Sequence, residues 1–224
     1  MKRYGMLVAL CAIVMLLLLL SCDCGDEPSN GDNDEECVIV FEENWDSGEI
    51  DTSEWGYVDP YGSGGHKTSI VDAELRVNGS SDLTYGCGII AKTGYTNNTK
   101  LTVVFRFNYI GGSDNRGFIH FRNSGERDED GRPTGNRLFG IFVSPDTNHY
   151  LFIGDSVGNY YPLVTSTVLG QYYSLEINFN NDEAQFTTGD SIVVLPFSYS
   201  HYHIYFGGHL VDCYYDNLDI CEWQ

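Results

Sequence analysis

The stretch LTVVFRFNY, residues 101–109, decides the fold class. Apolar and polar side chains alternate along it, so an extended chain here has one apolar face and one mixed face. The stretch YYSLEINF, residues 172–179, has the same period of two. This pattern is typical of an antiparallel sheet that turns only one face to the core, and it predicts a strand in each stretch.

The rest of the chain predicts more strands and no helices. No segment of 11 or more residues has apolar positions at the helical spacing. Short runs punctuated by Gly, Asn, Asp and Ser predict strands at 37–42, 69–77, 87–92, 117–122, 137–143, 149–154, 184–188, 191–195, 201–206 and 213–221. About a dozen short strands joined by turns indicate an all-β protein. They predict a two-sheet antiparallel β-sandwich of the jelly-roll type.

The first 21 residues have the pattern of an export signal. Lys2 and Arg3 precede an uncharged apolar run at 6–20, which is shorter than the roughly 20 residues that span a bilayer. Residues 19–22, LLSC, resemble the lipobox of bacterial lipoproteins, in which the cysteine becomes the acylated first residue after cleavage. We therefore expect a lipoprotein signal peptide at 1–21 and lipidation of Cys22. The alternative is an ordinary signal peptide that is cleaved near Ser21 and leaves Cys22 unmodified.

Residues 22–36 have the composition of a flexible spacer. They are rich in Asp, Glu, Gly, Asn and Ser and contain nothing apolar enough to seed a core. The folded domain is expected at 37–224. An acidic stretch after a lipidated cysteine also resembles the surface-export signal of Bacteroidetes lipoproteins. The expected location is therefore the bacterial cell envelope, as a lipid-anchored protein of the outer membrane exposed at the surface.

The charge of the chain narrows the range of partners. The formal net charge is −20, and loss of Lys2 and Arg3 with the signal makes it more negative still. Nucleic acids and anionic lipid headgroups both need Lys and Arg to neutralise their phosphates. We therefore expect no nucleic-acid partner, and contact with a membrane only through the lipid anchor.

Both ends of the predicted domain resemble the concanavalin A-like lectin and glucanase superfamily. FEENWDSGEIDTSEW, residues 41–55, is similar to the opening of these proteins, where an acidic and aromatic strand end leads through a Gly turn to the motif at 50–55. CYYDNLDICEW, residues 213–223, is similar to their closing strand. The resemblance extends to laminin G-like and family 16 glucanase members, spans 38–222 and implies a concanavalin-like jelly roll.

The resemblance also implies a pairing of cysteines. In these jelly rolls the first and last strands pair antiparallel, so Cys37 and Cys221 would face each other and form a disulfide. Cys87 and Cys213, each at the head of a predicted strand, would then form a second bridge, as suits an exported protein. The sequence leaves the connectivity open, and Cys24 remains in the spacer without an assigned partner.

The same pairing of the end strands would bring acidic side chains together. Carboxylates that converge repel one another unless a cation or protons intervene, and such oxygen-rich sites suit Ca²⁺. Many members of the superfamily hold a structural Ca²⁺ at this place. The resemblance implies Glu43 and Asp216 as its ligands here. The alternative is that both are exposed side chains beside a turn.

The sequence does not contain the catalytic motif of the glucanases. Glycoside hydrolases use two carboxylates across the scissile bond, and family 16 members set theirs on one strand as Glu-x-Asp-x-x-Glu. That pattern is absent, and the nearest candidate, ERDEDG at 126–131, is typical of a loop. A hydrolase therefore stays an alternative without assigned catalytic residues. One form of it is suggested by the strand at 117–122, which resembles a strand of 3-keto-disaccharide hydrolases.

Aromatic and cationic residues occupy non-core positions on three predicted strands. Sugars bind with their apolar faces against aromatic rings, and the concave sheet of a jelly roll is their usual place. If these strands are neighbours, they form a binding patch that contains His120, Arg122, Tyr150, His203 and Tyr205. The alternative is that these rings only stabilise the sheet through cross-strand pairs.

The sequence thus predicts a surface-anchored carbohydrate-binding or adhesion module whose partner is a polysaccharide. A glycan-active hydrolase and a structural protein that contacts another protein are the two alternatives.

Overall fold

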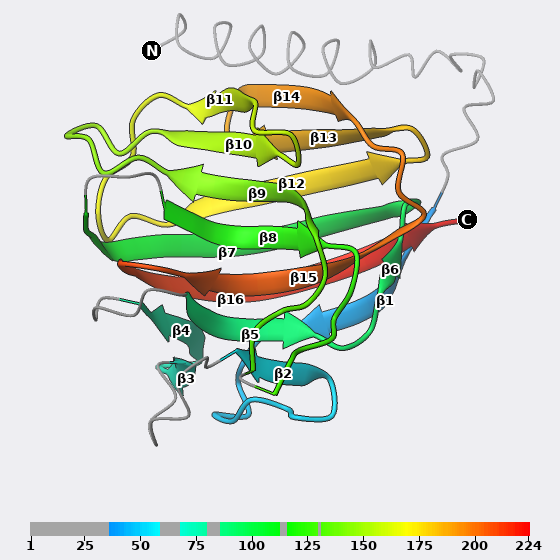
Figure 1. Ribbon diagram of the computed structural model, residues 1–224, viewed down its shortest axis with the longest axis horizontal. Helices are drawn as coiled ribbons and strands as arrows, with labels where there is room; N and C mark the ends of the chain where they lie inside the picture. Colours follow the sequence, from blue (N-terminus) through cyan, green and yellow to red (C-terminus); the bar gives the residue numbers. More distant parts are fainter. Residues whose placement is uncertain (1–35, 59–67, 80–85, 113–115, 130) are drawn as a thin grey trace, which may run out of the picture. The chain divides into compact units, whose positions relative to one another are not determined.

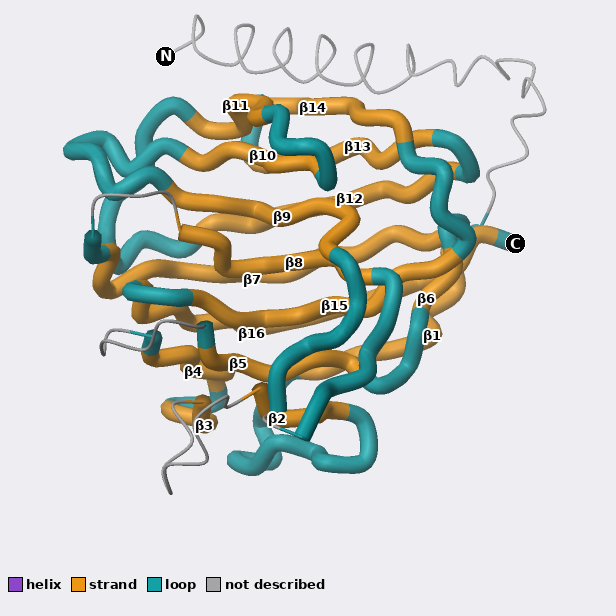
Figure 2. Tube along the Cα trace, viewed as in Figure 1, coloured by secondary structure: helices purple, strands orange, loops and turns teal. Residues whose placement is uncertain are grey.

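The computed structural model describes residues 36–58, 68–79, 86–112, 116–129 and 131–224. The predicted signal peptide, Cys22, Cys24 and the spacer lie outside the described residues. Every regular element within these ranges is a strand (Figure 2). No helix in the described part of the chain is long and apolar enough to cross a membrane.

The strands form two antiparallel sheets that pack face to face (Figure 1). Sheet A has the order β14 (Ser191–Pro196), β13 (Glu183–Thr188), β12 (Tyr173–Asn180), β7 (Thr99–Ile110), β16 (Val211–Trp223), β4 (Glu74–Asn78) and β3 (Thr68–Val71), with β1 (Cys37–Glu43) paired to β16. Sheet B has the order β11 (Tyr160–Val164), β10 (Leu151–Asp155), β9 (Arg137–Val143), β8 (Arg116–Arg122), β15 (His201–Gly208), β5 (Cys87–Ala91) and β2 (Trp55–Val58), with β6 (Tyr95–Thr96) paired to β15. The predicted two-sheet β-sandwich is confirmed.

The first and last strands pair as the resemblance implied. β1 runs antiparallel to β16, with Cys37 opposite Trp223 and Ile39 opposite Cys221. Cys37 and Cys221 form a disulfide with their Cα atoms 5.3 Å apart. The bridge therefore joins the two ends of the described domain.

The second predicted disulfide is absent, which corrects the sequence prediction. Cys87 and Cys213 are buried thiols. Cys87 lies in β5 of sheet B opposite Gly208, whereas Cys213 lies in β16 of sheet A opposite Val77. The two thiols therefore lie on facing sheets, and a position at the head of a strand does not by itself bring two sulfur atoms to bonding distance. Burial raises the pKa of the Cys213 thiol well above its ordinary value.

Most strand predictions match the structure, with one clear exception. The single strand expected at 69–77 is a hairpin of β3 and β4, because Asp72 and Ala73 both have positive φ, 55° and 61°. Two consecutive residues with positive φ make the tight turn that suits a two-residue hairpin loop. The short strands β2, β6 and β11 were not predicted.

The acidic opening stretch at 41–55 has a structural role. Trp45 and Trp55 are fully buried, with ring centroids 5.7 Å apart. Asp51 accepts hydrogen bonds from the Ser53 amide at 2.8 Å and the Ser53 hydroxyl at 2.7 Å, and these bonds lower its pKa. Glu43 accepts one from the Trp45 amide at 3.0 Å. These carboxylates therefore shape the turns that deliver two tryptophans to the core.

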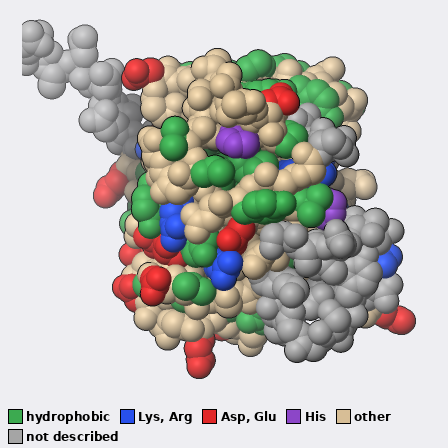
Figure 3. All heavy atoms as spheres, turned by 90° about the vertical axis from the view of Figure 1, so that its left-hand side faces the viewer, with side chains coloured by type: hydrophobic (Ala, Val, Ile, Leu, Met, Phe, Trp, Pro, Cys, Tyr) green, Lys and Arg blue, Asp and Glu red, His purple; other side chains and the backbone are tan. Residues whose placement is uncertain are grey.

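The outer face of sheet A holds a compact group of paired charges. Arg76 Nε lies 2.9 Å from Asp212 Oδ1, and Arg106 Nη2 lies 2.5 Å from Glu74 Oε2. Tyr214 stands between the two arginines in the sheet, and the Arg106 guanidinium lies 3.9 Å from its ring centroid. Acidic and basic side chains also lie side by side at the left of Figure 3.

Candidate functional site

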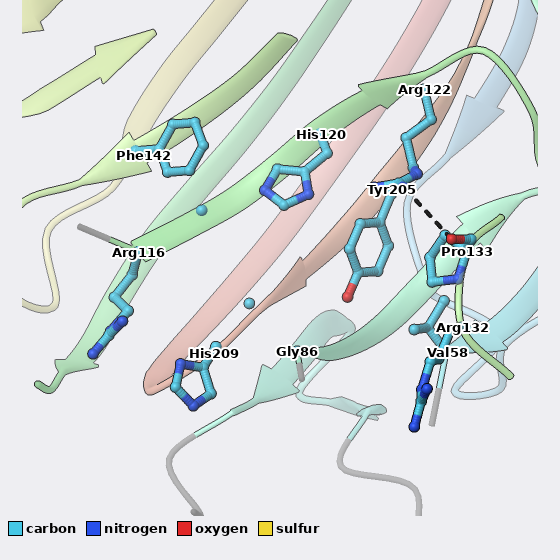
Figure 4. Close-up of a pocket in the computed structure, with 12 residues that line it drawn as sticks. Val58, Gly86, Arg116, His120, Arg122, Arg132, Pro133, Phe142, Tyr205 and His209 are labelled. Carbon is cyan, nitrogen blue, oxygen red and sulfur yellow. Dashed lines mark hydrogen bonds between the residues drawn. The ribbon is translucent and has the colours of Figure 1, made fainter. Parts of the chain in front are cut away.

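A pocket of about 350 Å³ opens on the outer face of sheet B. Its floor comes from β8 and β15, which pair in register with His120 opposite Tyr205. The loop that follows β8 provides Arg132 and Pro133, and β9 provides Phe142. The volume lies within the usual range for small-molecule sites. The pocket is lined by Val58, Gly86, Arg116, Gly117, His120, Arg122, Arg132, Pro133, Phe142, Tyr205, Gly208 and His209 (Figure 4).

His120 lies at the centre of this pocket, between Phe142 and Tyr205 (Figure 4). Its ring centroid is 5.7 Å from that of Phe142 and 5.4 Å from that of Tyr205. Both of its ring nitrogens are shielded from solvent and make no hydrogen bond within the described protein. Burial lowers the pKa of His120 to about 3, with repulsion from Arg137 and Arg122 adding to the effect. A neutral imidazole offers one donor and one acceptor, so His120 can bond a hydroxyl group in either sense.

Tyr205 has its phenol held against the backbone. Its hydroxyl donates to the Cys87 carbonyl oxygen at 3.3 Å. Burial raises the pKa of Tyr205 well above its ordinary value, although the charge of Arg122 opposes the rise. The phenol therefore stays protonated throughout the range in which proteins are folded.

Arginines stand on either side of His120 (Figure 4). Arg122 donates to the carbonyl oxygens of Pro133, at 3.4 Å, and Gly135, while its Nε is buried without a partner. Burial lowers the pKa of Arg122, and the charge of Arg137 lowers it further. At the other side, Arg116 donates through Nε to the Gly111 carbonyl at 3.1 Å and lies near His209.

An aromatic group extends the pocket along sheet B. Phe142 and Phe152 are stacked, with centroids 5.4 Å apart and ring planes 9° apart. Tyr160 meets Phe152 edge-on at 5.1 Å and is 60% exposed. Glycine makes room for these rings, because a Cβ at Gly140 would lie 2.6 Å from the Phe142 ring. We call Phe142, Phe152 and Tyr160 the aromatic shelf. Phe142 and Phe152 are buried, so Tyr160 is the ring that the shelf exposes beside the pocket.

The structure brings together three of the five residues predicted to bind carbohydrate. His120, Arg122 and Tyr205 all line the pocket. Tyr150 lies just before β10, with its ring 5.6 Å from Phe152, at the end of the aromatic shelf. His203 is opposite Arg122 on β15, but its Nδ1 lies 3.1 Å from the Ala91 carbonyl oxygen, which accepts its hydrogen bond. Burial lowers the pKa of His203. Its place is beside the pocket and not in its lining.

Sequence reasoning missed Arg116, Phe142 and His209. The strand β8 has a register shift between Gly117 and Ile119, so both Phe118 and Ile119 are buried in the core. A simple alternation from His120 back along the strand therefore cannot assign faces beyond that shift. Phe142 belongs to a continuous buried run in β9, where alternation gives no signal.

Glu43 and Asp216 lie on the paired end strands β1 and β16, where Glu43 is opposite Leu218. In the described residues, no group of three or more His, Cys, Asp and Glu side chains could hold a metal ion. Asp216 accepts hydrogen bonds from the amide and the side chain of Asn217, at 2.8 and 3.0 Å. Its pKa is raised by burial and by repulsion from Glu74 and Asp46. Calcium at Glu43 and Asp216 stays a prediction. A melting temperature that rises with added Ca²⁺ and falls with a chelator would support it.

None of the described residues that line the pocket is Asp or Glu. This composition stands out in a chain of net charge −20. The described ion pairs, Arg76 with Asp212, Arg106 with Glu74 and Lys100 with Glu176, all lie in sheet A. The described lining residues thus include three arginines and no acid, on a strongly negative protein.

Comparison with solved structures places the fold among glycan-active enzymes. One similar protein is described with the endo-acting O-glycanases of human gut microbiota that initiate mucin breakdown. It is 12% identical with a TM-score of 0.62, over 83% of this chain and 100% of that one. The laminarinase of Rhodothermus marinus is 10% identical with a TM-score of 0.60, over 84% and 98%. An alginate lyase of Pseudomonas aeruginosa is 11% identical with a TM-score of 0.59, over 77% and 100%.

No family model and no curated protein matches the sequence. At 10–12% identity the structural likeness shows the fold alone, and that fold is the concanavalin A-like jelly roll expected from the two end segments.

Proposed function

We propose that this protein binds a polysaccharide along the outer face of sheet B, with the pocket around His120 and the aromatic shelf as its binding surface. The observation that carries the proposal is their position side by side on one face. Phe142 belongs to both, because it lines the pocket beside His120 and stacks on Phe152. The exposed ring of Tyr160 suits the apolar face of a sugar, and the nitrogens of His120, which have no hydrogen-bond partner in the described protein, suit its hydroxyls.

Binding fits this geometry better than cleavage. Hydrolysis by the common route needs two carboxylates, and none of the described lining residues supplies one. General base catalysis works best with a pKa near the working pH, whereas the pKa of His120 is about 3 and that of Tyr205 is raised by burial. The described side chains in the pocket thus offer shape, hydrogen bonds and charge, but not the two carboxylates of a common glycoside hydrolase.

Export and anchoring complete the proposal. A signal peptide at 1–21 and lipidation at Cys22 would place this domain on the cell surface, where polysaccharides are encountered. A mass of the purified protein that includes a diacylglyceryl group on Cys22 would support the anchor. Replacement of Cys22 by Ser should release the protein from the membrane fraction.

The test is binding to a panel of polysaccharides in affinity electrophoresis, with Tyr160→Ala as the informative variant. Tyr160 is exposed, so its loss should not unfold the protein. Stacking of an aromatic ring contributes about 1 kcal/mol, so we expect affinity to fall by about fivefold. Tyr109→Ala is the matched control, because Tyr109 is 45% exposed on β7 of sheet A and lies outside the shelf.

Failure of the whole panel to retard the protein would contradict the proposal and favour a structural protein that contacts another protein. Equal losses in the Tyr160 and Tyr109 variants would remove the shelf from the binding surface. Sustained release of new reducing ends from a bound polysaccharide would favour the hydrolase alternative.

A further inference from the structure

We propose that the ligand of this pocket is an anionic glycan, one that bears uronate carboxylates or sulfate esters. The inference rests on the proposed function and names the chemical class of its ligand. It is carried by the arrangement of Arg116 and Arg122 on either side of His120, in a pocket whose described lining residues include no acid.

Two arginines of the pocket, Arg116 and Arg122, have no acidic partner among the described residues. Arg116 and Arg122 take part in none of the described ion pairs, and their described hydrogen bonds go to backbone carbonyl oxygens. A buried charge is costly unless an opposite charge compensates it. A carboxylate or sulfate of the ligand would supply that charge, and charge-assisted hydrogen bonds to a guanidinium are among the strongest in proteins.

The two arginines occupy opposite ends of the same strand. Arg122 lies six positions after Arg116 along β8, which corresponds to at most roughly 20 Å of extended chain. His120 and Tyr205 lie between them (Figure 4). Arg116 is held by the Gly111 carbonyl and Arg122 by the Gly135 carbonyl, near opposite ends of the strand, so a chain of sugars with charges on several units suits both better than one small anion does. The geometry thus favours a polymer with repeated negative charge over a small anion.

The charge of the rest of the molecule makes this site selective. A protein of net charge −20 repels polyanions as a whole, so it has no general affinity for them. Any retained polyanion must therefore be held by a local positive site. Neutral polysaccharides offer the arginines only uncharged acceptors, so they gain less from this site than a polyanion does.

The experiment compares matched pairs of charged and neutral polymers on the full-length protein. Polygalacturonate is compared with its methyl ester, and dextran sulfate with dextran. We expect the charged member of at least one pair to bind at least tenfold more tightly than its neutral counterpart. A difference in the polygalacturonate pair identifies a carboxylate ligand, and a difference in the dextran pair identifies a sulfate ligand.

Substitution then assigns the effect to the pocket. Arg116→Gln should weaken binding of the charged polymer at least tenfold, as loss of a charged hydrogen bond predicts, and leave the neutral polymer unaffected. Arg116→Glu should weaken it further. Lys100→Gln on sheet A is the matched control, since it changes the net charge equally at a site outside the pocket. Melting curves of each variant verify that it is folded.

Failure of the proposed function and failure of the anionic-ligand assignment give different results. If no polymer binds, the proposed function fails. If dextran or the methyl ester binds as tightly as its charged counterpart, or if Arg116→Gln and Lys100→Gln have the same effect, the protein binds glycans but the assignment of an anionic ligand is wrong.

Discussion

The outer faces of the two sheets use arginine in opposite ways. On sheet A, the hydrogen bonds that Arg76 donates to Asp212 and Arg106 donates to Glu74 raise the pKa values of both arginines. On sheet B, burial lowers the pKa of Arg122, and the described protein gives it no carboxylate. The same side chain is thus part of the structure on one face and unsatisfied on the other. The difference teaches that the charge partner, and not the residue type, marks a binding surface.

The largest expected effect is a loss of stability when an ion pair on the outer face of sheet A is disrupted. Glu74→Ala leaves the guanidinium of Arg106 without its carboxylate, in a pair whose side chains are only 8% and 18% exposed. Removal of one partner from such a pair should lower the free energy of unfolding by about 3 kcal/mol, measured by urea denaturation.

Glu176→Ala is its control, because Glu176 pairs with Lys100 on a more exposed part of sheet A, at 39% and 30%. We expect a loss of about 0.5 kcal/mol or less there. Equal losses in the two variants would mean that the pairing on the outer face of sheet A has no special structural role.

The second largest effect is a dependence of the free energy of unfolding on pH, and it arises from His120 in the pocket. His120 has an ordinary pKa of 6.5 that falls to about 3 in the folded protein. Between these values the unfolded chain binds a proton that the folded protein refuses, so stability should fall as the pH falls. At pH 5 this single group should cost about 2 kcal/mol relative to pH 7.

The measurement is the unfolding free energy of the protein and of His120→Phe at pH 7 and pH 5. The phenyl ring fills the same space without titrating. His203 and His209 also have pKa values lowered by burial, and they contribute equally to both proteins. Parallel pH profiles would show that His120 is not held neutral by its surroundings.

The smallest expected effect tests whether an arginine on the outer face of sheet B contributes less to stability than the paired arginines of sheet A. Arg116→Gln should change the free energy of unfolding by no more than about 0.5 kcal/mol, because its described contact is one hydrogen bond to the Gly111 carbonyl. A loss comparable with that of Glu74→Ala would show that Arg116 is a structural residue like Arg106, and the distinction between the two faces would fail.

Local pattern predicted the sheets well, because alternation with a period of two reports directly which side of a strand is buried. LTVVFRFNY became the central part of β7, with Leu101, Val103, Phe105 and Phe107 all buried. The end strands and their disulfide followed from the resemblance of the two terminal segments. The hairpin turn at Asp72 and Ala73 was missed, since neither residue type announces a positive φ.

The site was predicted only in part, because it depends on contacts between strands. His120, Arg122 and Tyr205 followed from alternation once β8 and β15 proved to be neighbours. Arg116 lies beyond a register shift, and the absence of acids from the described lining arises from loops and strands far apart in the sequence. Strand order and loop position are global properties that no local pattern specifies.

The disulfide between Cys37 and Cys221 has a mechanical consequence. Under the proposed anchoring and polymer binding, the domain would be pulled at its ligand and at its tether. Tension that enters the domain through the chain before Cys37 passes directly through a covalent bond into β16, a strand hydrogen-bonded to β7 and β4 in the middle of sheet A. The edge strand β1 is thereby spared from being unzipped one hydrogen bond at a time, and the force is spread over a whole sheet in shear.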